Sequence, residues 1–207
     1  MHVSNRLFWE WVEKNFPSYF NDNILEFGSY DINGTIKDCF KNYKTYVGID
    51  WRSGPCVDVV GLAHEVKFDY KAKAVLSASM LEHDPHWEDS LDNMINHLDP
   101  NGIFVLTWGS AKNPPHCLKE APDGDFHSLP AKKVINHLEK QGFTIPISIY
   151  DAELKNILTK EDTEKIHFVS PNVDGYGEFN LVAFKNLTTD ITVPKFNSVL
   201  MKEDEIN

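Results

Sequence analysis

A glycine and an aspartate follow two short apolar runs, at a spacing that suits the binding of a nucleoside. Residues 24–27 lead into Gly28, and residues 46–49 lead into Asp50, 22 positions after the glycine. A glycine at a strand end lets a ligand approach the backbone closely, because no Cβ intervenes. In dinucleotide-type folds an acid about 20 residues further on accepts hydrogen bonds from ribose hydroxyls. The pair predicts a site for an adenosine-containing ligand; a plain tight turn and a helix cap are the structural alternatives.

The residues after Gly28 would supply further hydrogen-bond donors to such a ligand. The turn reads Ser-Tyr-Asp-Ile-Asn-Gly over residues 29–34, and a helix is expected over residues 34–42. Its inward side chains would be Ile36, Cys39, Phe40 and Tyr43. The first N–H groups of a helix are unpaired and carry the positive end of its dipole, so they can face the ligand.

Several side chains could accept a proton from a reacting group. Glu82, His83 and His86 follow the apolar run 74–78, while His116 and His127 lie further along the chain. A positioned base of this kind adds about 10²- to 10⁴-fold to a rate. His83 has a structural alternative as a contact of the ligand or a satisfied buried histidine, and His64 most simply packs or contacts the ligand.

Glu82, His83, Asp84 and His86 could also be read as metal ligands. Mg²⁺ prefers oxygen ligands, whereas this group is rich in histidine. Three cysteines, Cys39, Cys56 and Cys117, have no CxxC spacing. The sequence therefore predicts neither a metal centre nor a disulfide framework.

Strand-like and helix-like segments alternate along the chain, which predicts an α/β fold with a doubly wound, mostly parallel sheet. Helical spacing marks a helix from Ser4 to before Pro17, another over residues 87–98, and a third that Ser128 and Pro130 open and Gly142 ends. Asp99-Pro100-Asn101-Gly102 has the composition of a turn. Expected strands cover residues 23–27, 46–49, 57–60, 74–78, 103–108, 143–149 and 179–184.

Residues 111–127 have no periodicity and contain three prolines and a glycine. Structureless segments of this length in compact domains are usually binding loops or lids. Trp51 could stack on adenine, Trp108 could line the acceptor site or pack in the core, and Trp87 is expected in the core. Arg52 is either a solvated charge or a contact of the cofactor or acceptor.

The 207 residues fit one domain over residues 1–200, followed by an acidic tail at 201–207 that is expected to be disordered. The net charge of −11 disfavours nucleic acid, because phosphate-binding surfaces need clustered Lys and Arg. No apolar run is as long as a membrane span and the N-terminal segment is not a secretory signal, so a cytoplasmic protein is expected.

In the order of these markers the chain resembles the class I S-adenosylmethionine (SAM)-dependent methyltransferases, over roughly residues 24–143. Glu26 and Gly28 match the acid and first glycine of the family's first motif, and Asp50 matches the acid of the second. Gly61-Leu62-Ala63-His64 stands at the adenine-side motif. Ser79-Met80-Leu81-Glu82-His83-Asp84 is similar to the family's L-E-H stretch, and residues 99–102 to its L-x-P-G-G turn.

The resemblance implies a seven-stranded Rossmann-like sheet with an antiparallel last hairpin, and SAM as the cofactor. It implies a methyl transfer by in-line displacement to a hydroxyl or amine. The acidic net charge and the aromatic-lined loop favour a small-molecule or sugar-type acceptor, which residues 111–127 would cover. Holding the reactants in line can supply about 7 to 11 kcal/mol of the barrier. His83, His116 and His127 are the candidate catalytic residues. The implied cofactor-binding residues are Glu26, Gly28, Ser29, Asp31, Asn33, Gly34, Asp50, Trp51, Leu62, Ala63, Ser79, Met80 and His83.

Two other functions remain open at this point. A SAM-binding sensor or partner subunit without catalysis fits two departures from the family pattern. The second and third glycines of the first motif are not at their usual positions, and Leu62 stands where the adenine-side motif usually has an acid. A nicotinamide-dependent oxidoreductase would share the sheet and the ribose acid, but it would need the tighter GxGxxG turn, which this chain lacks.

Overall fold

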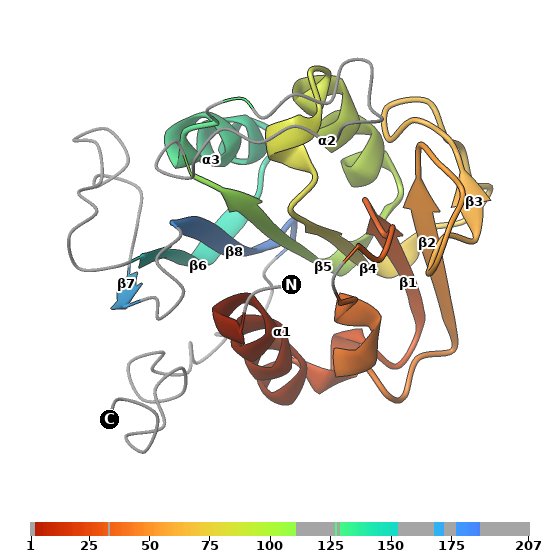
Figure 1. The fold of residues 1–207 in the computed structure, drawn as a ribbon, viewed down its shortest axis with the longest axis horizontal. Coiled ribbons are helices and arrows are strands. Elements are labelled where there is room, and N and C mark those ends of the chain that lie inside the picture. Colours follow the sequence, from red (N-terminus) through yellow and green to blue (C-terminus); the bar gives the residue numbers. More distant parts are fainter. Residues whose placement is uncertain are drawn as a thin grey trace.

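The structure, a computed structural model, describes residues 3–32, 34–110, 127, 129–152, 168–171 and 177–186. These residues form one sheet with helices on both faces (Figure 1). The strands are β1 (Asn23–Phe27), β2 (Thr45–Asp50), β3 (Val59–Val60), β4 (Ala72–Ala78), β5 (Leu98–Gly109), β6 (Thr144–Ala152), β7 (Phe168–Pro171) and β8 (Glu178–Phe184). The helices are α1 (Val3–Asn15), α2 (Trp87–Asn96) and α3 (Ala131–Lys140), with 3₁₀ turns η1 (Pro17–Tyr19), η2 (Ile36–Cys39) and η3 (Leu81–His83).

The strand order is β3-β2-β1-β4-β5-β8-β6-β7. Strands β1 to β5 pair in parallel, and β8 lies antiparallel between β5 and β6. The first seven strands in this order confirm the predicted doubly wound sheet with an antiparallel strand near its end. The short β7, which pairs in parallel with β6 at the edge, is an eighth strand that the sequence did not predict.

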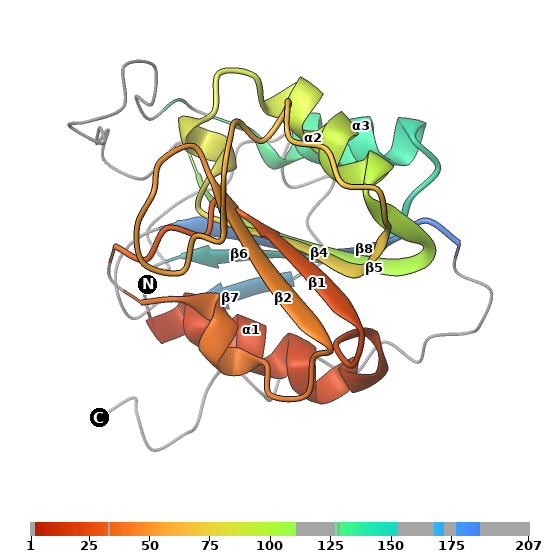
Figure 2. The ribbon, with the colours of Figure 1, turned by 90° about the vertical axis from the view of Figure 1, so that its right-hand side faces the viewer.

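Apolar side chains fill two layers, one on each face of the sheet. Helix α1 covers one face, and α2 and α3 cover the other (Figure 2). From α1, Phe8, Trp9, Trp11 and Val12 are almost fully buried. Burying each such side chain contributes about 1.5–3 kcal/mol. Because both faces are covered, residues 103–106 of β5 are all apolar and buried.

The helix expected over residues 34–42 is present only as the four-residue η2. Its inward residues Ile36, Cys39 and Phe40 are nevertheless buried, so the apolar pattern was read correctly and its length was not. Poor helix formers such as Asp38, Cys39 and Phe40 occupy this segment, and Phe40 is already extended at φ −105° and ψ 132°.

The predicted turn at residues 99–102 is assigned to β5, and the strand is irregular there. Ala72 lies opposite Leu98, whereas Ala74 lies opposite Ile103, so extra residues loop out of the ladder. The N–H of Asn101 donates to Asp99 Oδ1 at 2.8 Å, a local bond typical of turns. No described helix is long and apolar enough to cross a membrane. The predicted tail 201–207 lies outside the described residues.

Candidate functional site

The sheet brings the sequence-predicted residues to one edge. Gly28 follows β1, Asp50 ends β2, Leu62 comes shortly after β3, and Ser79 follows β4. Since β1 to β4 are parallel, their carboxyl ends lie together. The chain order reverses between β1 and β4, and ligands of open α/β sheets bind at such a point.

Gly28 lies where β1 and β4 end side by side. Its φ is +83°, in the left-handed region that favours glycine. A Cβ built on it would lie 2.6 Å from the Cβ of Met80. Its N–H donates to the carbonyl of Ile49 at 2.8 Å, which ties the turn to β2. The glycine is thus required by both the backbone conformation and the close approach.

Asp50 is buried beneath the turn after β1. Its Oδ2 accepts from the N–H of Tyr30 (3.2 Å) and its Oδ1 from the N–H of Arg52 (3.2 Å). Burial raises the pKa of this carboxyl, and the two N–H groups oppose the shift. Each carboxylate oxygen has a second lone pair, so both can still accept a hydroxyl proton from a ligand.

Aromatic and apolar groups surround this carboxylate. The guanidinium of Arg52 lies 4.0 Å from the ring centroid of Tyr30 and 5.4 Å from that of Trp51. Arg52 is therefore held by stacking and is not a freely solvated charge. Exposed large hydrophobics within the described part of the chain gather at this same edge: Ile32, Trp51, Val60 and Leu62. Exposed apolar groups at one place are typical of a binding surface.

The loop after β3, which carries Leu62 and Ala63, is fastened to α2 by side chains. Asn93 Nδ2 donates to the carbonyls of Ala63 and Val66, both at 2.8 Å. Lys67 Nζ donates to Asn93 Oδ1 at 2.7 Å. His97 Nε2 accepts from the N–H of Phe68 at 3.0 Å, which fixes the neutral form of the ring. These bonds hold the loop at the edge of the sheet.

We expect the attachment of the loop after β3 to α2 to weaken in acid. Burial lowers the pKa of His97, so the folded protein resists protonation of its ring while the unfolded chain does not. His97 therefore contributes stability above its unfolded pKa of about 6.5, and that contribution is lost as pH falls through the lower folded pKa. Chemical denaturation of wild type and His97→Gln from pH 5 to 7.5 tests this.

His97→Gln should lower the free energy of unfolding by about 1 kcal/mol at pH 7.5, because a hydrogen bond is lost. The difference between wild type and variant should shrink toward pH 5. Glu26 and Glu82 have pKa values raised to about 7 and titrate in the same range with the opposite sign. Only the difference between the two proteins isolates His97. A difference that stays constant across this range would contradict the prediction.

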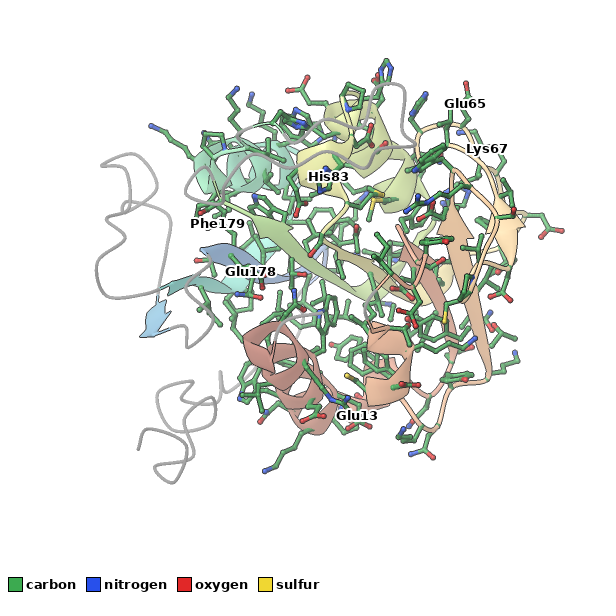
Figure 3. All side chains as sticks on the ribbon, in the orientation of Figure 1. Glu13, Glu65, Lys67, His83, Glu178 and Phe179 are labelled. Carbon is green, nitrogen blue, oxygen red and sulfur yellow. The ribbon has the colours of Figure 1, made fainter. Side chains whose placement is uncertain are left out.

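The chain after β4 brings several candidate groups to the same edge. Ser79 has a positive φ of +52°, and its N–H donates to the carbonyl of Thr107 at 2.8 Å. Strain of this kind is found preferentially at functional sites. Glu82 is 3% exposed and accepts from the N–H of Gly109 at 2.8 Å. The N–H of His127 donates to the Glu82 carbonyl at 2.8 Å, so His127 lies beside η3. His83, which is labelled in Figure 3, is the last residue of η3.

Glu26, the acid before Gly28, lies on the α1 face and is 2% exposed. Tyr46 Oη donates to its Oε2 at 2.7 Å. Burial raises the pKa of Glu26 to about 7, while the Tyr46 bond lowers it. Tyr46 of β2 therefore holds the carboxyl in place, and the charges of Asp50 and Asp31 also raise its pKa.

Two other predicted site residues, Ser29 and Asp31, lie in the turn after β1. Ser29 is buried with its Oγ 2.6 Å from where Gly48 would carry a Cβ, so its hydroxyl faces β2. Asp31 Oδ1 accepts from the N–H of Gly34 at 2.6 Å and closes the turn. Asn33, His116 and residues 111–126 lie outside the described residues.

The structure gives contacts to three further side chains. Trp108 is 1% exposed and its Nε1 donates to the Leu129 carbonyl at 3.0 Å, which places it in the core. Trp87 packs against the core and against His137 of α3. His64 stacks on His86 with ring centroids 4.6 Å apart. No group of three or more metal-binding side chains occurs among the described residues.

Sequence reasoning missed the residues that support the site from behind. Asn5, Asn93, His97, Thr107 and Glu178 were not predicted as site residues. Thr107 carries one usable signal, because it is a polar side chain within the otherwise apolar residues 103–108. Such a residue needs a partner when buried, so the interruption itself was the available evidence.

Comparison with known proteins rests on structure. No protein-family model and no curated protein sequence matches this chain. A Burkholderia thailandensis 1,6-didemethyltoxoflavin-N1-methyltransferase, crystallised with S-adenosylhomocysteine, is 13% identical with a TM-score of 0.60, covering 88% of this chain and 78% of its own. A SAM-dependent methyltransferase from Clostridium acetobutylicum is 8% identical with a TM-score of 0.59, over 86% and 90%. The [4+2]-cyclase SpnF is 14% identical with a TM-score of 0.57, over 87% and 81%.

These likenesses concern the fold, because each identity is far too low to carry a reaction across. The chain has the Rossmann-like fold of the class I SAM-dependent methyltransferases.

Proposed function

We propose that this protein binds SAM at the carboxyl edge of β1 to β4 and transfers its methyl group to a small-molecule acceptor. One observation carries the proposal. The glycine that the turn demands, a buried carboxylate with lone pairs to spare, and the exposed apolar side chains all meet where this fold has its switch point.

The residues present fit the three parts of SAM. Asp50 would accept the two ribose hydroxyls. Trp51 and Leu62, exposed by 37% and 44%, would cover the adenine from its two sides. Gly28 would let the methionine part lie against backbone, and Met80 and His83 would border the methyl group. Each of these assignments is a proposal about this chain's own residues.

SAM would supply a methyl group on a sulfonium, an activated leaving group that needs no protonation. The protein's contribution is then to orient and enclose the reactants, which can account for about 7 to 11 kcal/mol of the barrier. Asp50 and the turn at Gly28 would fix the sulfonium end, and the ends of β4 and β5 would hold the acceptor. His127 and His83 are the described histidines close to that place.

A second function remains a candidate because of one specific observation. SpnF is described as a [4+2]-cyclase and has the same fold, so a protein of this shape need not be a methyltransferase. A SAM-binding sensor is compatible with the same geometry. The sensor predicts SAM binding without turnover to S-adenosylhomocysteine, and a cyclase predicts no methyl transfer.

Two measurements on the full chain test the proposal. Isothermal titration with SAM, S-adenosylhomocysteine and NAD should show binding of the first two only. Incubation with SAM carrying a labelled methyl group and a metabolite extract should yield S-adenosylhomocysteine and a labelled product. Binding without any product across several extracts would favour the sensor, and binding of NAD alone would end the proposal.

His83 gives a further prediction about the role of the turn after β4. If His83, rather than Glu82, accepts a proton from the methyl acceptor, His83→Ala should lower kcat by about 10²-fold or more while leaving the Kd for SAM within about threefold. His86→Ala, which removes a ring that stacks on His64, is the matched control and should leave kcat nearly unchanged. Equal kinetics for wild type and His83→Ala would assign His83 a structural role.

A further inference from the structure

Two buried carboxyl groups flank the end of β5. The N–H of Gly109, the last residue of β5, donates to Glu82 Oε1 at 2.8 Å. Glu178, the first residue of β8, lies directly opposite Gly109 in the antiparallel pair. The two side chains are 3% and 4% exposed. Burial, and to a smaller extent the charge of Glu178, raises the pKa of Glu82 to about 7, so the two carboxyls influence each other.

Buried acceptors without a donor gather at this place among the described residues. Asn5 of α1 donates through Nδ2 to Glu178 Oε2 (3.1 Å) and to Thr107 Oγ1 (3.2 Å). Asn180 lies opposite Thr107 and two residues beyond Glu178, so its side chain is on the same face of the sheet. Three buried oxygens here have no hydrogen-bond partner in the described structure: Asn5 Oδ1, Asn180 Oδ1 and Glu82 Oε2.

An acceptor left without a donor in a protein interior costs about 1–3 kcal/mol, and natural proteins keep few of them. Here three lie at the substrate edge of the sheet, beside two carboxyl groups. What they lack is a group with several N–H donors. A positive charge would also match the carboxylates and the net charge of −11, which draws cations toward the protein. An alcohol offers one donor and no charge, and a carboxylate or phosphate would be repelled.

We propose that the methyl acceptor is a small-molecule amine, bound as its ammonium form across the end of β5, between Glu82 and Glu178 and against the side-chain carbonyl of Asn180. This inference rests on the proposed methyltransferase function and narrows its substrate class. Asn5 positions Glu178 through its Nδ2, and its Oδ1 is one of the three acceptors that face the ammonium group. Figure 3 shows Glu178 at the start of β8 and His83 beyond the end of β4, on the two sides of this place.

An ammonium must lose a proton before its nitrogen can react. The Glu82 carboxylate takes one proton from R–NH₃⁺ and leaves R–NH₂ with a free lone pair. The N–CH₃ bond then forms as the S–CH₃ bond of SAM breaks and its electron pair stays on sulfur. The products are R–NH₂CH₃⁺, S-adenosylhomocysteine and a protonated Glu82, which returns its proton to solvent. A carboxyl group with a pKa near 7 can both accept and release that proton at neutral pH.

Matched amines and alcohols test the proposal on the full chain saturated with S-adenosylhomocysteine. The probes are benzylamine with benzyl alcohol, and 1,4-diaminobutane with 1,4-butanediol, each titrated calorimetrically. We expect at least one amine to bind, and to bind about tenfold or more tightly than its alcohol. In Glu178→Gln that preference should fall by about tenfold, while the Kd for SAM stays unchanged. The Gln carbonyl keeps an acceptor for Asn5, so the local fold should survive.

Glu13→Gln, the same change at a partly exposed residue of α1, is the control and should bind amines as wild type does. If Glu178→Gln unfolds, Glu82→Gln replaces it, because its carbonyl can still accept from Gly109. Amines that bind no better than their alcohols, or binding that survives both changes, overturn the inference while SAM binding and the proposed function stand. A protein that does not bind SAM at all overturns both.

Discussion

Gly28→Ala should destabilise the protein and weaken SAM binding more than any other single methyl addition at the site. An alanine at φ +83° pays about 1–2 kcal/mol for a left-handed backbone. Its Cβ would also lie 2.6 Å from the Cβ of Met80, so the turn after β4 must move, at a cost of about 1–3 kcal/mol. Chemical denaturation should therefore show a loss of roughly 2–5 kcal/mol in the free energy of unfolding.

Gly142→Ala is the matched control for this change. Gly142 has nearly the same φ, +84°, but nothing lies within 4 Å of a Cβ built on it. It should pay only the backbone cost, about 1–2 kcal/mol, and should bind SAM as wild type does. In Gly28→Ala the displaced Met80 should lower SAM affinity by about tenfold or more. Equal destabilisation of the two variants would mean that the close approach of β1 and Met80 does not matter.

The glycine and the acid were found from sequence because each is demanded by its own backbone position. Gly28 ends an apolar run and Asp50 ends the next one, so local pattern alone places both at strand ends. Parallel pairing of β1 with β2 then brings the two together, with the N–H of Tyr30 on the Asp50 carboxylate. No contact beyond those of neighbouring strands was needed to predict this pair of residues.

The support of the site depends on contacts that no local pattern reveals. Asn93 reaches back 30 residues to the Ala63 carbonyl, and Asn5 reaches 173 residues to Glu178. On α2, Asn93 alternates with apolar residues as a solvent-facing side chain would. Only the packing of the loop after β3 against α2 shows that it is buried. A single sequence carries no information about which polar residue meets which.

The prediction of the fold also succeeded where local patterns decide the structure and failed where they do not. Strand β1 was placed to the residue and β4 to within two residues, because runs buried on both faces are largely apolar. The strand predicted over residues 103–108 is only the regular part of the longer β5. The helix expected over residues 34–42 was wrong in length, since its inward residues can be buried as well from the short η2 as from a full helix. Strand β7 was missed because its four residues have no strong strand pattern.

The long-range contacts have a functional consequence for the arrangement of the site. The adenine side depends on α2 through Asn93 and His97, and the acceptor side depends on α1 through Asn5. These two helices cover opposite faces of the sheet (Figure 2). Changes in α2 should therefore affect the affinity for SAM, while changes at Asn5 should affect the acceptor. Asp50 lies between the adenine side and the acceptor side, and it belongs to the sheet itself.

Asp50→Asn should weaken SAM binding by about 1–3 kcal/mol, roughly 5- to 150-fold in Kd. The amide keeps one oxygen for the N–H of Arg52 or Tyr30, but its NH₂ faces the other N–H and can no longer accept a ribose hydroxyl. Because burial already raises the pKa of Asp50, removing its charge relieves a desolvation cost. The free energy of unfolding should thus change less than the affinity does.

Asp58→Asn separates the loss of a ligand contact from the loss of a backbone contact. Asp58 Oδ2 accepts from the N–H of Gly48, in the middle of β2, at 2.8 Å. Its amide should lower the free energy of unfolding by about 1 kcal/mol and leave the Kd for SAM unchanged. Titration calorimetry with SAM and with adenosine on both variants makes the comparison. Asp50→Asn should weaken both ligands equally, because both carry the ribose. Unaltered affinity for adenosine would remove Asp50 from the sugar and place the nucleoside elsewhere on the sheet.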